Sequence, residues 1–441
     1  MKKKTAEQKL DRFTPRVNFP YFVGVYLAVN AIEDAYLLVD GPDCAFLKGL
    51  RIQGLHDLGS TLFDAEGSHR IVFTGSKGRE GDEEARATVT GLVGEIGRQQ
   101  GCGVVLVSSL TPCAWPEERV SGNANVIHVP GQSLEGDWLD GYGRVLSSLA
   151  QTVRPAGDAP ADPDSVGIVG YFMDRREADH AAGIGELRTM LAALSLNTVS
   201  VWLDGGPVRD LERIGEAAAV ISLPYARDAA RRIAARTGAR LIETDLPVGI
   251  EGTLKWIREV AAWFGREQAA ETFIGSRLSS IIPKLEWVVP QVFLNRSFYV
   301  SADPFLAAGL CDMIREFGGR VAGCTVTARE GHMAAIKGEF SDLSFTMVFE
   351  PRESELRREH KKVEGGGADL FVGGSELSGF FKDAAGCVEL GFPSITRHAI
   401  FASPLLGLRG CLFLVQRIAD EMMRRGCMHD SGGSKGPGLE S

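Results

Sequence analysis

Short apolar runs that do not alternate with polar residues recur along this chain of 441 residues, and turn-forming residues follow them. The clearest is Ala35–Val39, which is followed at once by Gly41-Pro42-Asp43. A strand covered on both faces reads as such a continuous run, whereas a half-exposed strand alternates. Helical stretches lie between the runs, for example one with Leu92, Val93 and Ile96 on one face. Alternating strands and helices predict a doubly wound α/β fold.

The runs fall into three groups, which indicates three similar domains. We expect an N-terminal α/β domain over residues 14–150, a Pro/Ala/Asp-rich linker over 151–165, further α/β domains over 166–292 and 293–427, and a disordered tail over 428–441. The predicted architecture is three Rossmann-like domains whose parallel sheets are flanked by helices. The main strands are expected at residues 35–39, within 71–78 where a short strand ends in a Gly-rich loop, and at 104–109, 126–131, 166–172, 198–203, 218–223, 240–243, 297–301, 320–326, 343–349 and 370–373.

Composition narrows the class of protein. Hydrophobic residues make up 44% and charged residues 24%, as in ordinary globular proteins. The net charge of −9 argues against a nucleic-acid surface, and no apolar run approaches the length of a membrane span. No secretory signal is recognisable, and eight scattered cysteines do not resemble a disulfide framework. We therefore expect a cytoplasmic protein in which special cysteines serve metal ligation rather than cross-linking.

Common cofactor motifs are missing from the sequence. There is no GxxxxGK[ST] loop, no GxGxxG after a strand, no CxxC pair and no HExxH. Cys44 is the remaining candidate for a cofactor ligand. It follows a turn at the carboxyl end of a predicted parallel strand, where open α/β sheets bind ligands. A thiolate in that position can bind a metal cluster. The alternative interpretation is a buried, inert cysteine.

Six segments then follow one another in a characteristic order. They are Asp34–Cys44, Val105–Cys113, His128–Asp137, Leu246–Thr253 with Trp256, Ser301–Pro304 with Gly309 and Gly318, and Gly391–Pro393 with Pro404–Gly410. Together they resemble the component 1 family of nitrogenases and nitrogenase-like reductases. That family includes the catalytic subunits of dark-operative protochlorophyllide reductase, cofactor-assembly scaffolds and the reductive cyclase of nickel-tetrapyrrole biosynthesis. The resemblance extends from about Pro20 to Met422.

The chain also departs from the family pattern. The first of the family's three cluster cysteines is missing from Phe19–Gly24, and the third position holds Leu110, with Cys113 three residues later. The resemblance therefore implies Cys44 and Cys113 as cluster ligands, unless Cys113 is unrelated. The strand that carries the cofactor cysteine in nitrogenase corresponds to Ile221–Pro224, without a cysteine, so an iron–molybdenum cofactor bound in the usual way is not expected. His398 lies near the position of the cofactor histidine and is a candidate catalytic residue.

A [4Fe–4S] cluster takes four ligands, usually thiolates. Cys44 and Cys113 from both chains of a homodimer would supply four around a two-fold axis. A heterodimer with a related subunit that brings three ligands is the second arrangement, and a degenerate site that binds no cluster is the third.

The resemblance implies an electron-transferring reductase subunit. An ATP-binding iron–sulfur reductase protein would supply electrons, and the subunit-bridging cluster would pass them to a substrate between the domains. A non-catalytic scaffold for metal-cofactor assembly is the main alternative, and a metal-free α/β binding protein is another.

Other residues of these chemical types receive plainer interpretations. Packing is the expected role of Cys102, Cys311, Cys324 and Cys411, and Cys387 is expected just before a strand. His180, beside Asp179, is a weaker candidate for a proton donor at a strand end.

Overall fold

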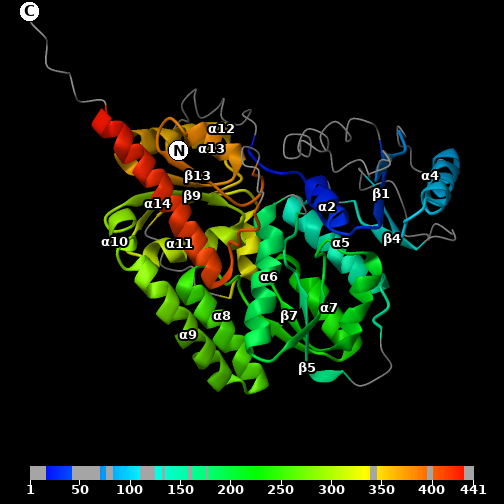
Figure 1. Ribbon diagram of the computed structural model, residues 1–441. Helices are drawn as coiled ribbons and strands as arrows, with labels where there is room; N and C mark the ends of the chain where they lie inside the picture. Colours follow the sequence, from blue (N-terminus) through cyan, green and yellow to red (C-terminus); the bar gives the residue numbers. More distant parts are fainter. Residues whose placement is uncertain are drawn as a thin grey trace, which may run out of the picture.

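The computed structural model describes residues 16–41, 70–75, 83–109, 125–131, 135–156, 161–174, 177–337, 345–394 and 401–431. Within these ranges the strands form three sheets, and neighbouring strands of each sheet run parallel. Helices flank the sheets (Figure 1). The predicted fold class, α/β with three parallel sheets, is confirmed. We refer to each sheet and its helices as the first, second and third unit.

The first unit has the strand order β2-β1-β3-β4. Its elements are α2 (Tyr21–Asn30), β1 (Ala35–Asp40), β2 (Ile71–Phe73), α4 (Glu83–Ile96), β3 (Val104–Ser109), β4 (Val126–Val129) and α5 (Trp138–Thr152). Strand β1 is buried throughout because both of its faces are covered. Tyr36 and Leu38 pack in a small cluster with Val93 of α4, whereas Leu37 and Val39 belong to the main core. This two-sided burial explains the unbroken apolar run in the sequence.

The second unit has the strand order β6-β5-β7-β8, in which the first strand of the unit lies inside the sheet. Its elements are β5 (Asp162–Val169), α6 (Ala178–Ala193), β6 (Asn197–Val201), η2 (Val208–Glu216), β7 (Ala217–Ser222), η3 (Pro224–Ala226), α7 (Arg227–Thr237), β8 (Arg240–Glu243), α8 (Gly249–Phe264) and α9 (Glu267–Leu285). The order changes direction at β5, so the chain winds outward on both sides of that strand.

The third unit has the strand order β11-β10-β9-β12-β13. Its elements are α10 (Val289–Val292), β9 (Ser297–Ala302), α11 (Pro304–Glu316), β10 (Arg320–Val326), η4 (Glu330–Ala335), β11 (Met347–Phe349), α12 (Glu353–Lys362), η5 (Val363–Gly367), β12 (Leu370–Gly373), α13 (Ser375–Phe381), β13 (Gly386–Glu389) and α14 (Gly407–Ser431). The long α14, red in Figure 1, packs against α6, α8 and α9 and so ties the third unit to the second.

Several predicted element boundaries differ from the structure. The segment predicted as a linker is partly regular, because α5 continues to Thr152 and β5 begins at Asp162. Cys387 lies inside β13, because the strand expected just after this residue begins already at Gly386. Helix α14 extends to Ser431, four residues into the segment predicted to be disordered. The predicted domain boundaries themselves stay a prediction.

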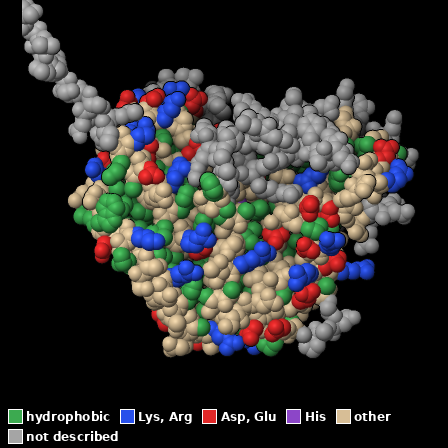
Figure 2. All heavy atoms as spheres, in the orientation of Figure 1, with side chains coloured by type: hydrophobic (Ala, Val, Ile, Leu, Met, Phe, Trp, Pro, Cys, Tyr) green, Lys and Arg blue, Asp and Glu red, His purple; other side chains and the backbone are tan. Residues whose placement is uncertain are grey.

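One continuous hydrophobic cluster contains buried residues from all three units. The units therefore share a core, and a contact between them is part of the fold. None of the described helices combines the length and the apolar character needed to cross a bilayer. On the face shown in Figure 2, basic and acidic side chains are interspersed.

Candidate functional site

The predicted cluster ligands Cys44 and Cys113 lie outside the described residues, but the strands that lead to them are described. Strand β1 ends at Asp40, four residues before Cys44, and β3 ends at Ser109, four residues before Cys113. The two strands are adjacent and parallel, with Asp40 paired to Ser109. Both cysteine-bearing segments therefore continue from the same edge of one sheet, the edge at which parallel α/β sheets bind ligands.

Side chains and tight packing fix this edge of the first sheet. The carboxylate of Asp40 accepts a hydrogen bond from the Thr74 hydroxyl at 2.8 Å, and the backbone N–H of Gly41 donates to the same Thr74 oxygen at 3.0 Å. After β4 the chain crosses the end of β3 at Gly131, where an added Cβ would lie 2.1 Å from the carbonyl oxygen of Ser109. Only glycine permits that approach.

Aromatic side chains from all three units meet where the units join. Phe172, which follows β5, lies 5.2 Å from Trp138 of α5, 5.4 Å from Tyr225 and 5.6 Å from Phe392 between ring centroids. Tyr225 in turn contacts Phe305 of α11 edge-to-face at 4.8 Å. Aromatic pairs in such geometries add about 1 kcal/mol each beyond their buried area. This centre is therefore a rigid apolar junction.

His180, the weaker proton-donor candidate, borders this junction. It lies in the first turn of α6 rather than at a strand end, and its ring centroid is 4.8 Å from that of Phe172. The backbone N–H of Asp174 donates to His180 Nδ1 at 2.8 Å. Because an amide can only donate, Nδ1 carries no proton and a neutral ring holds its proton on Nε2. The structure thereby assigns the tautomer, and the proton-donor role stays a prediction.

Glu177 is a site residue that the sequence analysis missed. Its carboxylate oxygen accepts a hydrogen bond from the backbone N–H of Ser394 at 2.6 Å, and its side chain is buried. Burial raises the pKa of Glu177 well above the usual range, and the nearby carboxylates of Asp179 and Asp174 raise it further. Burial and the two neighbouring carboxylates thus both favour the protonated form of Glu177. Ser394 lies four residues before His398, which is outside the described residues.

Another polar contact, centred on Asp137, joins the first unit to the third. Asp137 is the N-cap of α5, and its fully buried carboxylate accepts from the backbone N–H groups of Leu139 and Asp140. The same carboxylate accepts from the Arg329 N–H at 2.8 Å and pairs with His332 Nε2 at 2.9 Å. The Asp137-x-x-Asp140 spacing is a capping box that the sequence displays, but its partners almost 200 residues away leave no local signal.

Asp137, Asp140 and His332 are also close enough to hold a metal ion, because their ligand atoms lie within 4.8 Å of one another. Both oxygens of Asp137 are already engaged by three backbone N–H groups and by His332. These hydrogen bonds account for the grouping. We therefore interpret the three residues as a contact between the first and third units. Two carboxylates and an imidazole also differ from the thiolate ligands that iron–sulfur clusters prefer.

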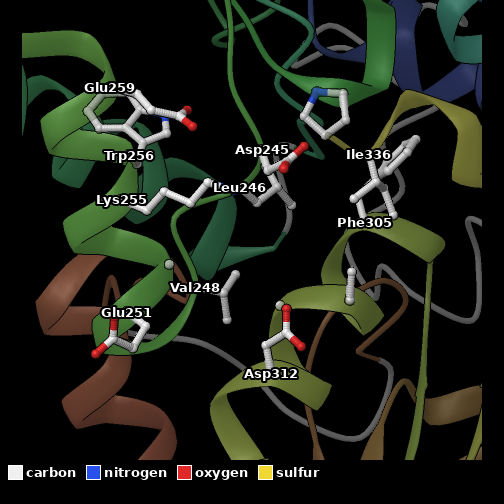
Figure 3. A pocket seen from close by; sticks show the side chains of 14 residues that line it. Asp245, Leu246, Val248, Glu251, Lys255, Trp256, Glu259, Phe305, Asp312 and Ile336 are labelled. Atoms are coloured by element: carbon white, nitrogen blue, oxygen red, sulfur yellow. The ribbon is translucent and has the colours of Figure 1, made fainter. Parts of the chain in front are cut away.

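A cavity of about 310 Å³ lies beside the aromatic junction. It opens between α8 of the second unit and α11 of the third, beyond the carboxyl ends of β7 and β8 (Figure 3). Phe305, which contacts Tyr225 of the junction, also lines the cavity and thus connects the two. Its position matches the general rule for ligand sites in parallel α/β sheets.

Three parallel α/β units that share a core define the class of protein, a doubly wound α/β protein with three sheets. Within this class, the sequence model described as nitrogenase component 1 type oxidoreductase matches residues 113–423. The chain therefore belongs to the nitrogenase component 1 type oxidoreductase family, as the sequence resemblance predicted. The match begins at Cys113, so Cys44 precedes it.

Relatives and solved structures agree with this membership. The chain is 22% identical to the nitrogenase molybdenum-iron protein beta chain of Methanothermobacter marburgensis over 318 residues, which is 68% of either protein. It is 31% identical to the light-independent protochlorophyllide reductase subunit N of a Bradyrhizobium strain over 153 residues, or 34% of this chain and 33% of that protein. The structure described as nitrogenase Cp1 at pH 6.5 superimposes with a TM-score of 0.73 and 15% identity, covering 96% of this chain and 95% of the other. This last likeness concerns the fold.

Proposed function

We propose that this chain is the electron-accepting subunit of a nitrogenase-like reductase. The observation that carries the proposal is the family match over residues 113–423. The pairing of Asp40 with Ser109 supports it, because the segments leading to Cys44 and Cys113 leave the sheet at neighbouring positions. Two thiolates from each chain of a homodimer, or Cys44 from this chain with three ligands from a related subunit, would complete the four ligands of a [4Fe–4S] cluster.

In this proposal the cluster supplies reversible one-electron transfer when it is bound, and an ATP-binding iron–sulfur reductase protein is the electron donor. The chain's own residues position the participants and control protons. The aromatic junction around Phe172 keeps water out of the region where the units meet. The carboxyl of Glu177, whose pKa is raised by burial, contacts the segment that leads to His398, the candidate catalytic residue. A reductase needs protons as well as electrons, and these groups are suited to deliver them.

A scaffold for metal-cofactor assembly is the second candidate function. It is favoured by Ser222, which ends β7 in the segment that corresponds to the cofactor-cysteine strand of nitrogenase, and which is completely buried. A hydroxyl is a poorer ligand for iron than a thiolate. A scaffold would bind a cluster or its precursor without accepting electrons from the reductase protein.

Anaerobic purification, iron and sulfide analysis and an absorbance spectrum test the proposal. We expect a brown protein with about four irons per dimer, bleached in Cys44→Ala and in Cys113→Ala. Cys102→Ala is the matched control, because Cys102 is half-buried beside β3 and its thiol lies against the carbonyl of Val104. A colourless wild-type protein that stays colourless after reconstitution would contradict the homodimeric cluster. A cluster that no ATP-dependent reductase protein reduces would favour the scaffold.

A further inference from the structure

The cavity between α8 and α11 has an apolar floor. Val248, Trp256 and Phe305 are buried, and they line it together with Ala308 of α11. The indole N–H of Trp256 donates to the Thr244 hydroxyl at 3.0 Å, which fixes the orientation of the ring. The walls are therefore rigid, and the cavity is large enough for a ligand with one or two rings.

The rim of this cavity is acidic on several sides. Asp245, Glu259 and Asp312 bring carboxylates toward it from the end of β8, from α8 and from α11 (Figure 3). Glu251 adds a fourth acid, and among the described lining residues the positive charge belongs to Lys255, which extends toward Leu246. The lining therefore carries an excess of negative charge.

Some of this charge is neutralised by neighbours, but not all of it. Asp245 lies 3.4 Å from a guanidinium nitrogen of the buried Arg227, and Glu259 lies 3.9 Å from the Lys337 ammonium. Asp312 has a different environment. Partial burial raises the pKa of its carboxyl, and the charges of Arg315 and Lys255 oppose that effect. A positive group inside the cavity would stabilise the ionised form of Asp312.

We propose that this cavity binds a small cationic ligand, namely an apolar ring system that carries a protonated amine or amidine. The apolar body contacts Trp256, Phe305 and Val248, and the cation lies near Asp312 and Glu259. Aromatic walls favour the same sign of charge, because a cation is attracted to an aromatic face. An anionic ligand would meet repulsion from the rim.

This inference goes beyond the proposed electron transfer. It rests on the proposed function in one respect only, namely that the ligand of the cavity would be the substrate of the reductase. Binding requires neither a cluster nor electrons. Failure of the binding test therefore leaves the reductase proposal standing, and failure of the iron analysis leaves the cavity proposal standing.

Titration calorimetry on the full-length protein tests the inference with three probes of the same shape. They are 1-naphthylmethylamine, 1-naphthalenemethanol and 1-naphthoate, which are cationic, neutral and anionic at pH 7.5. We expect the amine to bind about tenfold more tightly than the alcohol, the lower range for a charge-assisted hydrogen bond, and the naphthoate to bind more weakly than either. Equal binding of the three probes, tighter binding of naphthoate, or no binding of the amine would overturn the proposal.

Variants locate the binding. Asp312→Asn and Glu259→Gln should each reduce the preference for the amine over the alcohol, and Ala308→Leu should weaken both probes because it fills the cavity. Glu364→Gln removes the same charge from an exposed side chain of the third unit and should leave binding unchanged. If both acidic variants keep the wild-type preference, the amine binds elsewhere and the assignment of the cavity is wrong.

Discussion

At the scale of single residues, the contact between His332 and Asp137 should make stability depend on pH. Burial lowers the pKa of His332, but the hydrogen bond and the charge of Asp137 outweigh this effect and raise it above 6.5 overall. The pKa of Asp137 is lowered, because its hydrogen bonds outweigh its burial. The His332 contribution is complete below its unfolded pKa of about 6.5 and is lost as the pH rises through the folded value.

His332→Gln tests this dependence. We expect the free energy of unfolding to fall by about 2 kcal/mol at pH 6, because a buried carboxylate loses a charged partner. The difference between variant and wild type should shrink at pH 8.5. Urea denaturation at the two pH values measures both effects. A pH-independent difference would mean that the ring acts by packing alone.

Glu177 also has a raised folded pKa, but its substitution should stabilise the protein rather than destabilise it. Its protonated form favours the folded state, so its contribution is fully present below an unfolded pKa of about 4.3 and is lost progressively as the pH rises toward the folded value. Glu177→Gln removes the free-energy cost of ionising a buried carboxyl and keeps an oxygen that accepts the Ser394 N–H. We expect the variant to be more stable than wild type at pH 8, on the order of 1 kcal/mol, with no gain at pH 4.5.

Thermal unfolding at pH 4.5 and pH 8 measures this difference. Glu364→Gln provides the control, since its exposed side chain has no buried charge to relieve. A Glu177→Gln protein that is less stable at both pH values would show that Glu177 is ionised and that its charge is compensated.

Candidate site residues could be predicted from the sequence only where a local pattern marks them. The turn after Val39 pointed to Cys44 because strand ends in parallel sheets are readable from a local pattern. Glu177 could not be found in this way, since its partner Ser394 lies 217 residues away and only the packing of the second unit on the third brings them together. The positions of Cys44, Cys113 and His398 lie outside the described residues, so their roles stay predictions.

At the scale of elements, four strands were predicted with the bounds that the structure shows. Strands β3 and β12 are buried throughout, and their largely apolar runs have few alternatives. Strands β8 and β10 also have the expected bounds, although each begins with an exposed arginine and β8 is only partly buried. Strand β13 was expected to begin only after Cys387, since its first residue is Gly386 and its pairing with β12 decides its conformation. The start of β5 was missed for a similar reason: Asp162-Pro163-Asp164 has turn chemistry, yet Ser165 bonds to Asp162 and Glu216 and holds the segment extended.

Close packing of α2 on α5 yields an element-scale prediction. A Cβ added to Gly24 would lie 1.6 Å from the carbonyl oxygen of Trp138, so the helices cannot keep their distance. We expect Gly24→Ala to lower the free energy of unfolding by about 3 kcal/mol, as overpacking in a core does. Gly275→Ala is the matched control, because Gly275 lies inside α9 with open space around it. That change should stabilise the protein by about 0.5–1 kcal/mol. Equal effects of the two substitutions in urea denaturation would contradict the close α2–α5 contact.

At the scale of the whole molecule, the question is how two cysteines in each chain complete a cluster of four ligands. If the cluster lies on a two-fold axis, each chain supplies half of the ligands and iron content depends on association. We therefore expect the iron-loaded protein to have twice the 47.5 kDa mass of one chain in anaerobic light scattering. Removal of the iron with a chelator should shift the mass at low protein concentration toward one chain, because the bridging ligand bonds are lost.

A mixture of wild-type and Cys44→Ala chains distinguishes the two arrangements of subunits. In a homodimer with a shared cluster, mixed dimers have three of the four thiolates, so iron content should fall more steeply than the fraction of wild-type chains. In a heterodimer, the isolated chain should bind little iron at any mixing ratio and gain it when a related subunit is supplied. An iron content that is proportional to the fraction of wild-type chains would mean that each chain binds its own cluster. The proposal of a shared cluster would then be wrong.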